Sequence, residues 1–94
     1  MGQEKKYTIT YHRDVPHDIA GLDSFWHEQI LRVIEEKILV NPEIFGKPLR
    51  RSLKGYRTLR VGDYRIVFRI EKTRINVIAI IHRSEVYKEV GKRI

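Results

Sequence analysis

The chain of 94 residues contains no cysteine, which excludes a disulfide framework and a thiolate metal site. Its apolar runs fall far short of the roughly 20 residues that a membrane-spanning helix needs, so no membrane contact is expected. The opening residues, MGQEKKYTIT, have no apolar signal segment. His12, His17 and His27 are scattered without metal-ligand spacing. These features fit a cytoplasmic protein, which is the location we expect.

Acidic residues are scarce in the second half of the chain. Residues 1–46 hold five Lys and Arg against eight Asp and Glu, a net charge of −3, whereas residues 47–94 hold fourteen against four, a net charge of +10. Concentrated positive charge attracts polyanions, with nucleic acid first among them. The charge alone also fits a basic surface that serves only solubility.

The length predicts a single domain over residues 1–94, with room for one sheet and two or three helices. Residues 6–12, KYTITYH, alternate in the manner of a strand. A proline in the first turn fits a short helix over residues 15–20. Asp23 or Ser24 then caps a long helix, which the Asn-Pro pair at 41–42 ends. Its apolar residues recur with a helical period, at Trp26, Ile30, Val33, Ile34 and Ile38.

The second half predicts a connection over residues 41–54 and then three consecutive antiparallel strands. The strands lie at residues 55–61, 64–70 and 74–82, and Gly62-Asp63 forms the first turn between them. The last strand contains INVIAII, which is apolar on both faces, so we place it centrally in the sheet. A final short helix is expected from Ser84 to about Val90, with Gly91 ending it.

This order predicts an α+β fold, β-α-α-β-β-β(-α), with an antiparallel sheet and helices packed on one face. In RVGDYRIVFRI, the side chains of Tyr64, Ile66 and Phe68 alternate toward the helices. Arg65 and Arg69 then point from the opposite face, which we expect to be open and basic.

Three segments of the chain resemble the RelE/ParE toxin superfamily, and its RelE branch in particular. LKGYRTLRVGDYRIVFRI holds a Gly-Asp-Tyr-Arg hairpin, and HRSEVYKEV holds a closing His-Arg-x-x-Val-Tyr. NPEIFGKPLRRSLKGY resembles the segment that precedes the hairpin in this superfamily. With the first strand and the long helix, the resemblance spans nearly the whole chain.

The resemblance implies the toxin of a type II toxin–antitoxin system. In the RelE branch it implies an endoribonuclease that cuts messenger RNA in the ribosomal A site without a metal or organic cofactor. The implied partners are messenger RNA, the ribosome and a RelB-like antitoxin, with which the toxin forms hetero-oligomers. The implied chemistry is attack of a ribose 2′-hydroxyl on the neighbouring phosphate, which needs acid–base groups and positive charge at the phosphate.

The resemblance also implies the site residues. Arg65 matches the hairpin arginine, Arg83 the closing arginine, and Tyr87 the closing tyrosine, which could stack on a base or transfer a proton. Arg60 lies across the hairpin from Arg65, and His82 could serve as an acid or a base. Candidate contacts to the RNA backbone are Arg50, Arg51, Lys54, Arg57 and Arg69.

Each of these residues also has a structural reading. The arginines fit a solvated sheet face, Tyr87 fits packing of the last helix, and His82 fits a hydrogen-bonded structural histidine. One departure stands beside them, because Tyr56 and Thr58 occupy the places where RelE members carry two lysines. Two alternatives therefore stay open: a ParE-like inhibitor of DNA gyrase, or a catalytically weak nucleic-acid-binding member of the same fold.

Overall fold

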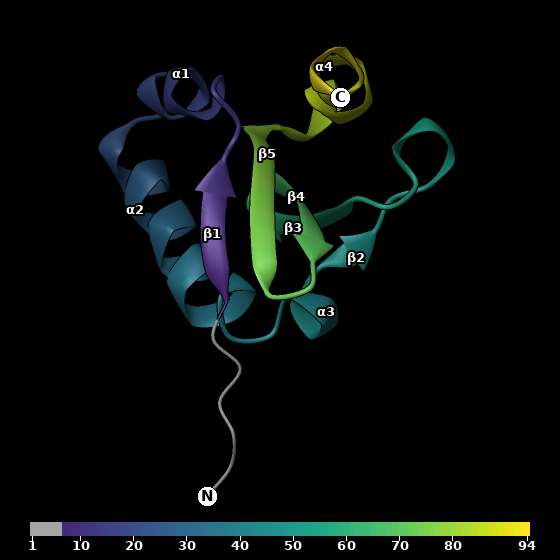
Figure 1. The fold of residues 1–94 in the computed structure, drawn as a ribbon. Helices are drawn as coiled ribbons and strands as arrows, with labels where there is room; N and C mark the ends of the chain where they lie inside the picture. Colours follow the sequence, from purple (N-terminus) through teal and green to yellow (C-terminus); the bar gives the residue numbers. More distant parts are fainter. Residues whose placement is uncertain (1–6) are drawn as a thin grey trace, which may run out of the picture.

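The computed structural model describes residues 7–94 and shows one five-stranded sheet in the spatial order β1-β5-β4-β3-β2 (Figure 1). The strands are β1 (Thr8–Tyr11), β2 (Lys47–Pro48), β3 (Arg57–Val61), β4 (Tyr64–Glu71) and β5 (Arg74–His82). The three consecutive strands β3, β4 and β5 pair antiparallel, as the sequence predicts. Of the first predicted strand, Lys6 lies outside the described residues. The α+β class is confirmed.

The pairing of β1 corrects the expectation of a wholly antiparallel sheet. β1 pairs with β5 in the parallel sense, with Thr8 opposite Arg74 and Tyr11 opposite Val77. A parallel pair needs a long crossover between its strands, and the segment between β1 and β5 supplies it with helices and three further strands. As a result β5 lies inside the sheet, between β1 and β4, which its doubly apolar sequence predicts.

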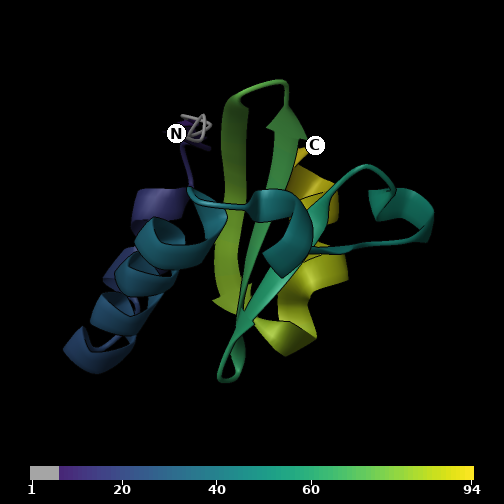
Figure 2. The ribbon, with the colours of Figure 1, turned by 90° about the horizontal axis from the view of Figure 1, so that it is seen from below.

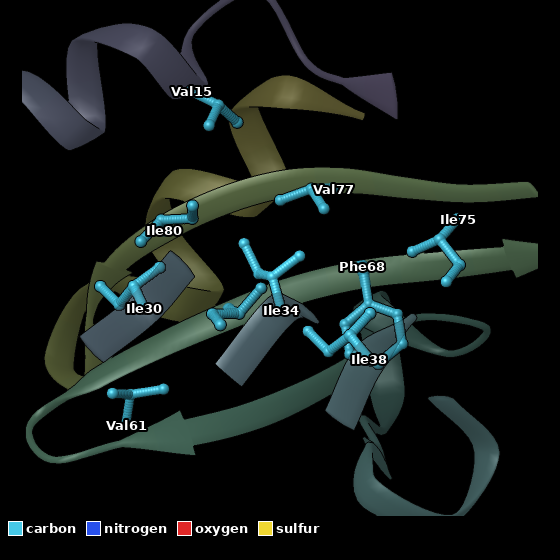
Figure 3. Packing of buried hydrophobic residues seen from close by; sticks show 10 residues of the cluster. Val15, Ile30, Ile34, Ile38, Val61, Phe68, Ile75, Val77 and Ile80 are labelled. Carbon is cyan, nitrogen blue, oxygen red and sulfur yellow. The ribbon is translucent and has the colours of Figure 1, made fainter. Parts of the chain in front are cut away.

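Helices cover the first face of the sheet. They are α1 (Val15–Ala20) and α2 (Ser24–Val33), and α2 continues as the π-helix η1 (Ile34–Ile38). Asp23 caps α2, where its carboxylate accepts a hydrogen bond from the Trp26 backbone N–H at 3.1 Å. The helical stripe is buried against the sheet, and Figure 3 shows Ile30, Ile34 and Ile38 facing Phe68, Val77 and Ile80.

The second face is not fully open, which corrects the expectation of helices on one face alone. The last helix, α4 (Val86–Arg93), follows the 3₁₀ turn η3 (Arg83–Glu85) and lies on the side opposite α2 (Figure 2). Its Val86 and Val90 form a second buried cluster with Leu53, Val67 and Ala79. The physical reason is that Val67 and Ala79 are apolar groups on the arginine face and need a cover.

A β-bulge in β5 decides which residues share a face. Val67 lies opposite Ala79, but Phe68 lies opposite Val77, so Ile78 is an extra residue without a partner in β4. Beyond this bulge the alternation is shifted by one. Ile80 therefore joins Val77 on the helix face, although strict alternation puts the two residues on opposite faces.

The connection over residues 41–54 is more ordered than the sequence predicts. It holds α3 (Pro42–Phe45), the short strand β2 and the 3₁₀ turn η2 (Arg51–Leu53). The predicted stop at Gly91 is also wrong, since α4 continues to Arg93. Gly91 has no steric conflict in a helix, and Arg93 is fixed by a buried ion pair. Over residues 7–94, each helix is too short or too polar to cross a membrane.

The β3–β4 hairpin tip generates a testable prediction. Gly62 has a φ of 61°, and a Cβ built there meets the Trp26 ring of α2 at 2.4 Å. Gly55 has a φ of 98° with open space around it, so it serves as a matched control. We expect Gly55→Ala to lower the free energy of unfolding by about 1–2 kcal/mol through backbone strain, and Gly62→Ala to lower it by about 1–3 kcal/mol more through overpacking.

Denaturant unfolding of the two variants and the wild type measures this difference. Equal losses in the two variants contradict a close contact between the hairpin tip and Trp26.

Candidate active site

A hollow of about 440 Å³ lies on the α4 side of the sheet. It is bounded by side chains from β3, β4, the turn η3, the start of α4 and the loop before η2, and the lining residues are Leu49, Thr58, Arg65, Arg83, Ser84, Val86 and Tyr87. The structure therefore brings together Arg65, Arg83 and Tyr87, the three residues that match the motif positions. Arg65 lies in β4, whereas Arg83 and Tyr87 lie in η3 and α4, which follow β5 in the sequence.

The hairpin and the end of β5 fix the arginines relative to one another. Arg60 and Arg65 lie directly opposite in β3 and β4 and so share the face on which the hollow lies. The Arg83 backbone N–H donates to the Asp63 carbonyl at 2.8 Å, which ties the turn after β5 to the hairpin tip. This bond places the start of η3 beside the hairpin.

Neighbouring positive charges repel one another at this site. The pKa of Arg65 is lowered, first by burial and then by the nearby charges of Arg60 and Arg83, while Asp63 acts in the opposite direction. Arg65 donates from Nη1 to the carbonyls of Gly62 at 3.2 Å and Tyr64 at 3.0 Å. A guanidinium carries five N–H donors, so donors remain for an anion. An anion in the hollow relieves the repulsion.

Two uncharged hydroxyl groups and one aromatic ring complete the hollow. Tyr87 is 50% exposed in the first turn of α4, where its ring is available for stacking. Thr58 lines the hollow beside Arg65, and within residues 7–94 its Oγ1 is the one buried side-chain polar atom without a hydrogen-bond partner in the protein. Ser84 also lines the hollow. Sequence reasoning missed Thr58 and Ser84 as site residues, although Thr58 shares the face of Arg60 by strand alternation.

His82 lies away from this hollow. Its Nδ1 accepts from the Ser84 backbone N–H at 3.1 Å and lies 2.8 Å from the Ser84 hydroxyl, so it caps the turn η3. Its ring meets Tyr64 edge-on at 6.1 Å, on the α1 side of the sheet, where it borders a separate hollow with His17 and Glu85. The structural reading of His82 is therefore the one that the geometry favours.

The predicted RNA-backbone contacts divide into two groups. Arg57 faces the helix side, where it donates to the carbonyls of Gly46 at 2.9 Å and Glu43 at 3.3 Å and anchors α3. The others are exposed on the loop that includes η2 and on β4: Arg50, Arg51, Lys54 and Arg69. Arg69 lies over the Tyr56 ring at 5.7 Å.

The part of the chain that the structure describes holds no group of three or more His, Asp or Glu side chains placed to bind a metal ion. The polar groups of the hollow are instead guanidinium and hydroxyl groups. These donors suit a phosphate, because a guanidinium fork matches two phosphate oxygens.

Comparison with known proteins finds relatives of this chain among the toxins of type II toxin–antitoxin systems. A family described as the ParE toxin of the type II toxin–antitoxin system matches residues 6–87. Toxin RelE of Mycobacterium tuberculosis is 30% identical over 90 residues, which cover 94% of this chain and 93% of that toxin. Toxin RelG of the same organism is 32% identical over 89 residues, covering 88% of this chain and 93% of its own length.

Solved structures of toxins have a fold similar to that of this chain. The toxin–antitoxin complex RelBE2 of M. tuberculosis contains a chain with a TM-score of 0.76 and 28% identity, covering 83% of this chain and 99% of that chain. A mutant of the Escherichia coli toxin RelE in the free state has a TM-score of 0.73 and 25% identity, covering 95% and 98%. The RelB–RelE complex of Methanococcus jannaschii, at 18% identity, shares the fold, with a TM-score of 0.66 and coverage of 84% and 95%.

The charge arrangement of the hollow predicts a stabilising effect of phosphate. At constant ionic strength, replacing chloride by about 10 mM phosphate should raise the unfolding temperature of the wild type by roughly 2–4 °C, since a bound anion stabilises the folded state. Arg83→Gln should reduce this shift, because it removes one of the two positive charges beside Arg65 that attract the anion. Thermal unfolding followed by circular dichroism measures it, and equal shifts in both proteins contradict an anion site at Arg83.

Proposed function

The chain belongs to the ParE toxin family of type II toxin–antitoxin systems, and from this premise we propose that it is a ribosome-dependent endoribonuclease that cuts messenger RNA in the A site. The convergence of Arg65, Arg83 and Tyr87 on one hollow is the observation that carries the proposal. In this proposal the protein acts in the cytoplasm, where translating ribosomes present the message.

The proposed reaction is an intramolecular transesterification at a phosphodiester of the RNA. The 2′-oxygen attacks the adjacent phosphorus, the bond to the 5′-oxygen of the next nucleotide breaks, and the products are a 2′,3′-cyclic phosphate and a 5′-hydroxyl. The proton of the 2′-hydroxyl is lost and the leaving 5′-oxygen gains one. Negative charge builds on the phosphate oxygens in the transition state, and donors already aimed at that place lower the barrier.

In the proposal Arg65 and Arg83 are these donors, and Tyr87 orients the message by stacking on a base. The lining of the hollow, all of it within the described residues, includes no histidine, lysine or carboxylate. Tyr87 is then the group with a proton to exchange. We therefore attribute most of the rate enhancement to charge stabilisation and orientation, and a smaller share to proton transfer than a site with lysines provides.

The proposed regulator is a RelB-like antitoxin. Related toxins are seen in solved toxin–antitoxin complexes, and the charge of +10 on residues 47–94 suits an acidic segment. Such a segment could cover the arginine side of the sheet or displace α4. Either arrangement blocks the hollow, because Tyr87 belongs to α4 and Arg65 to β4.

Two specific observations keep other functions in view. The match to the ParE toxin family favours inhibition of DNA gyrase as the second candidate. Tyr56 and Thr58, which stand where RelE members carry lysines, favour a member that binds RNA but cuts it slowly. In both cases the hollow serves binding and not catalysis.

Cleavage of a defined message on stalled ribosomes, mapped by primer extension, tests the proposal. We expect cuts in the A site only when ribosomes are present. Arg65→Ala and Arg83→Ala should each lower the cleavage rate by about 100-fold, the usual cost of losing one donor at a developing charge. Arg32→Ala, which removes an exposed arginine from α2, is the matched control and should cleave at the wild-type rate.

Three other outcomes each point elsewhere. An uncut message together with loss of gyrase supercoiling supports the second candidate. Salt-dependent RNA binding without cleavage supports the third. Full activity of both arginine variants means that the site is wrongly assigned.

A further inference from the structure

The last helix ends in a buried ion pair with the first helix. Arg93 of α4 donates from Nη2 and Nη1 to the two carboxylate oxygens of Asp18 in α1, each at 2.8 Å. The Arg93 side chain is 8% exposed and the Asp18 side chain 5% exposed. The bidentate bonds raise the pKa of Arg93, so it stays charged. Asp14 lies 3.8 Å from Arg93 Nε, and the charges of Asp14 and Glu89 also raise the pKa of Arg93.

This ion pair also satisfies backbone groups of β5 that lack a neighbouring strand. β1 pairs with β5 only as far as Val77. Just beyond, the Ile78 carbonyl accepts from Arg93 Nη1 at 2.9 Å, and the Ile80 N–H donates to Asp18 Oδ2 at 3.0 Å. The two side chains thus take the place of a strand at this edge. Figure 1 shows α1 and α4 on either side of this end of β5.

The position of Arg93 on α4 links the ion pair to the hollow. Val86, Val90 and Arg93 follow a helical spacing of four and three, so they share the stripe that faces the sheet. A helix of eight residues does not hold its shape alone, and Val86 and Val90 are its two buried apolar side chains. Its polar anchor at the far end is the bond to Asp18.

We propose that Arg93 and Asp18 are positioning residues, whose bidentate ion pair holds α4 so that Tyr87 and Arg83 stay aligned with Arg65 in the hollow. The expected effect on the cleavage rate rests on the proposed function, whereas the expected effect on the stability of α4 does not. Removing one partner leaves a buried charge without compensation, which is costly. The helix then leaves its place more often, while the hairpin that carries Arg65 and Arg60 is unaffected.

Amide hydrogen exchange and single-turnover cleavage on ribosomes test this inference together. Arg93→Gln and Asp18→Asn should each speed exchange of the α4 amides by at least about tenfold, with β4 amides unchanged. Each should lower the maximal cleavage rate by about tenfold with little change in the ribosome concentration that gives half-saturation. The double variant Asp18→Asn/Arg93→Gln should lose less than the two single losses combined, because no buried charge is left alone.

Lys92→Gln is the matched control. It removes a positive charge from the same turn of α4, where Lys92 is 65% exposed and 3.6 Å from Glu89. It should match the wild type in both measurements. If Arg93→Gln does not fold, Arg93→Lys takes its place, since it keeps the charge but loses the fork and should show the same changes at roughly threefold to tenfold.

The outcomes separate this inference from the proposed function. A wild type that does not cut RNA overturns the proposed cleavage, while faster α4 exchange in Arg93→Gln still supports the ion pair as the anchor of that helix. Wild-type exchange in α4 and a wild-type maximal rate in a folded Arg93 variant overturn the inference. An equal loss in Lys92→Gln overturns it as well, because charge on α4 and not the ion pair then matters.

Discussion

Burial of β5 on both faces is the constraint on which the rest of the structure depends. Its side chains alternate between two apolar clusters, so neither face of the sheet centre can remain in water. α1 and α2 cover one face, and the chain must supply a second cover after β5 ends. That cover is α4, and its arrival carries Arg83 and Tyr87 to the face from which Arg65 points. The candidate site is thus a consequence of completing the core.

The positive charges on the α4 side of the sheet lower the stability of the fold but favour binding of an anion. Burial and then the charges of Arg60 and Arg83 lower the pKa of Arg65, and the folded protein thus holds like charges close together. Natural proteins accept such conflicts at sites that meet a ligand of opposite charge. Here the arginine side chains are held by hydrogen bonds to the backbone, because the Gly62 carbonyl accepts from both Arg60 and Arg65. Phosphate is the ligand whose negative charge and geometry complement these guanidinium groups.

Much of the fold follows from local sequence, whereas most of the misses depend on contacts between segments that are distant in the sequence. Alternation in β4, the Asn-Pro stop and the Gly-Asp turn predict their elements correctly, since each depends on nearby residues. The bulge at Ile78 depends on pairing across the sheet and has no local signal. It shifts Ile80 and His82 to the helix face, which is why His82 leaves the site that its chemistry suggests. Arg57 lies on the helix face because it alternates with Thr58 in β3, and there it donates to the carbonyls of Glu43 and Gly46.

The claim that the α4 face meets RNA is tested most directly by side-chain NMR. A short single-stranded RNA, made uncleavable by 2′-O-methyl groups, is added to protein with labelled arginine and aromatic side chains. The account predicts the largest shifts at Arg65, Arg83 and Tyr87, with His17 and Trp26 on the helix face unchanged. Shifts centred on that opposite face, or none at any of the three site residues at saturating RNA, contradict it.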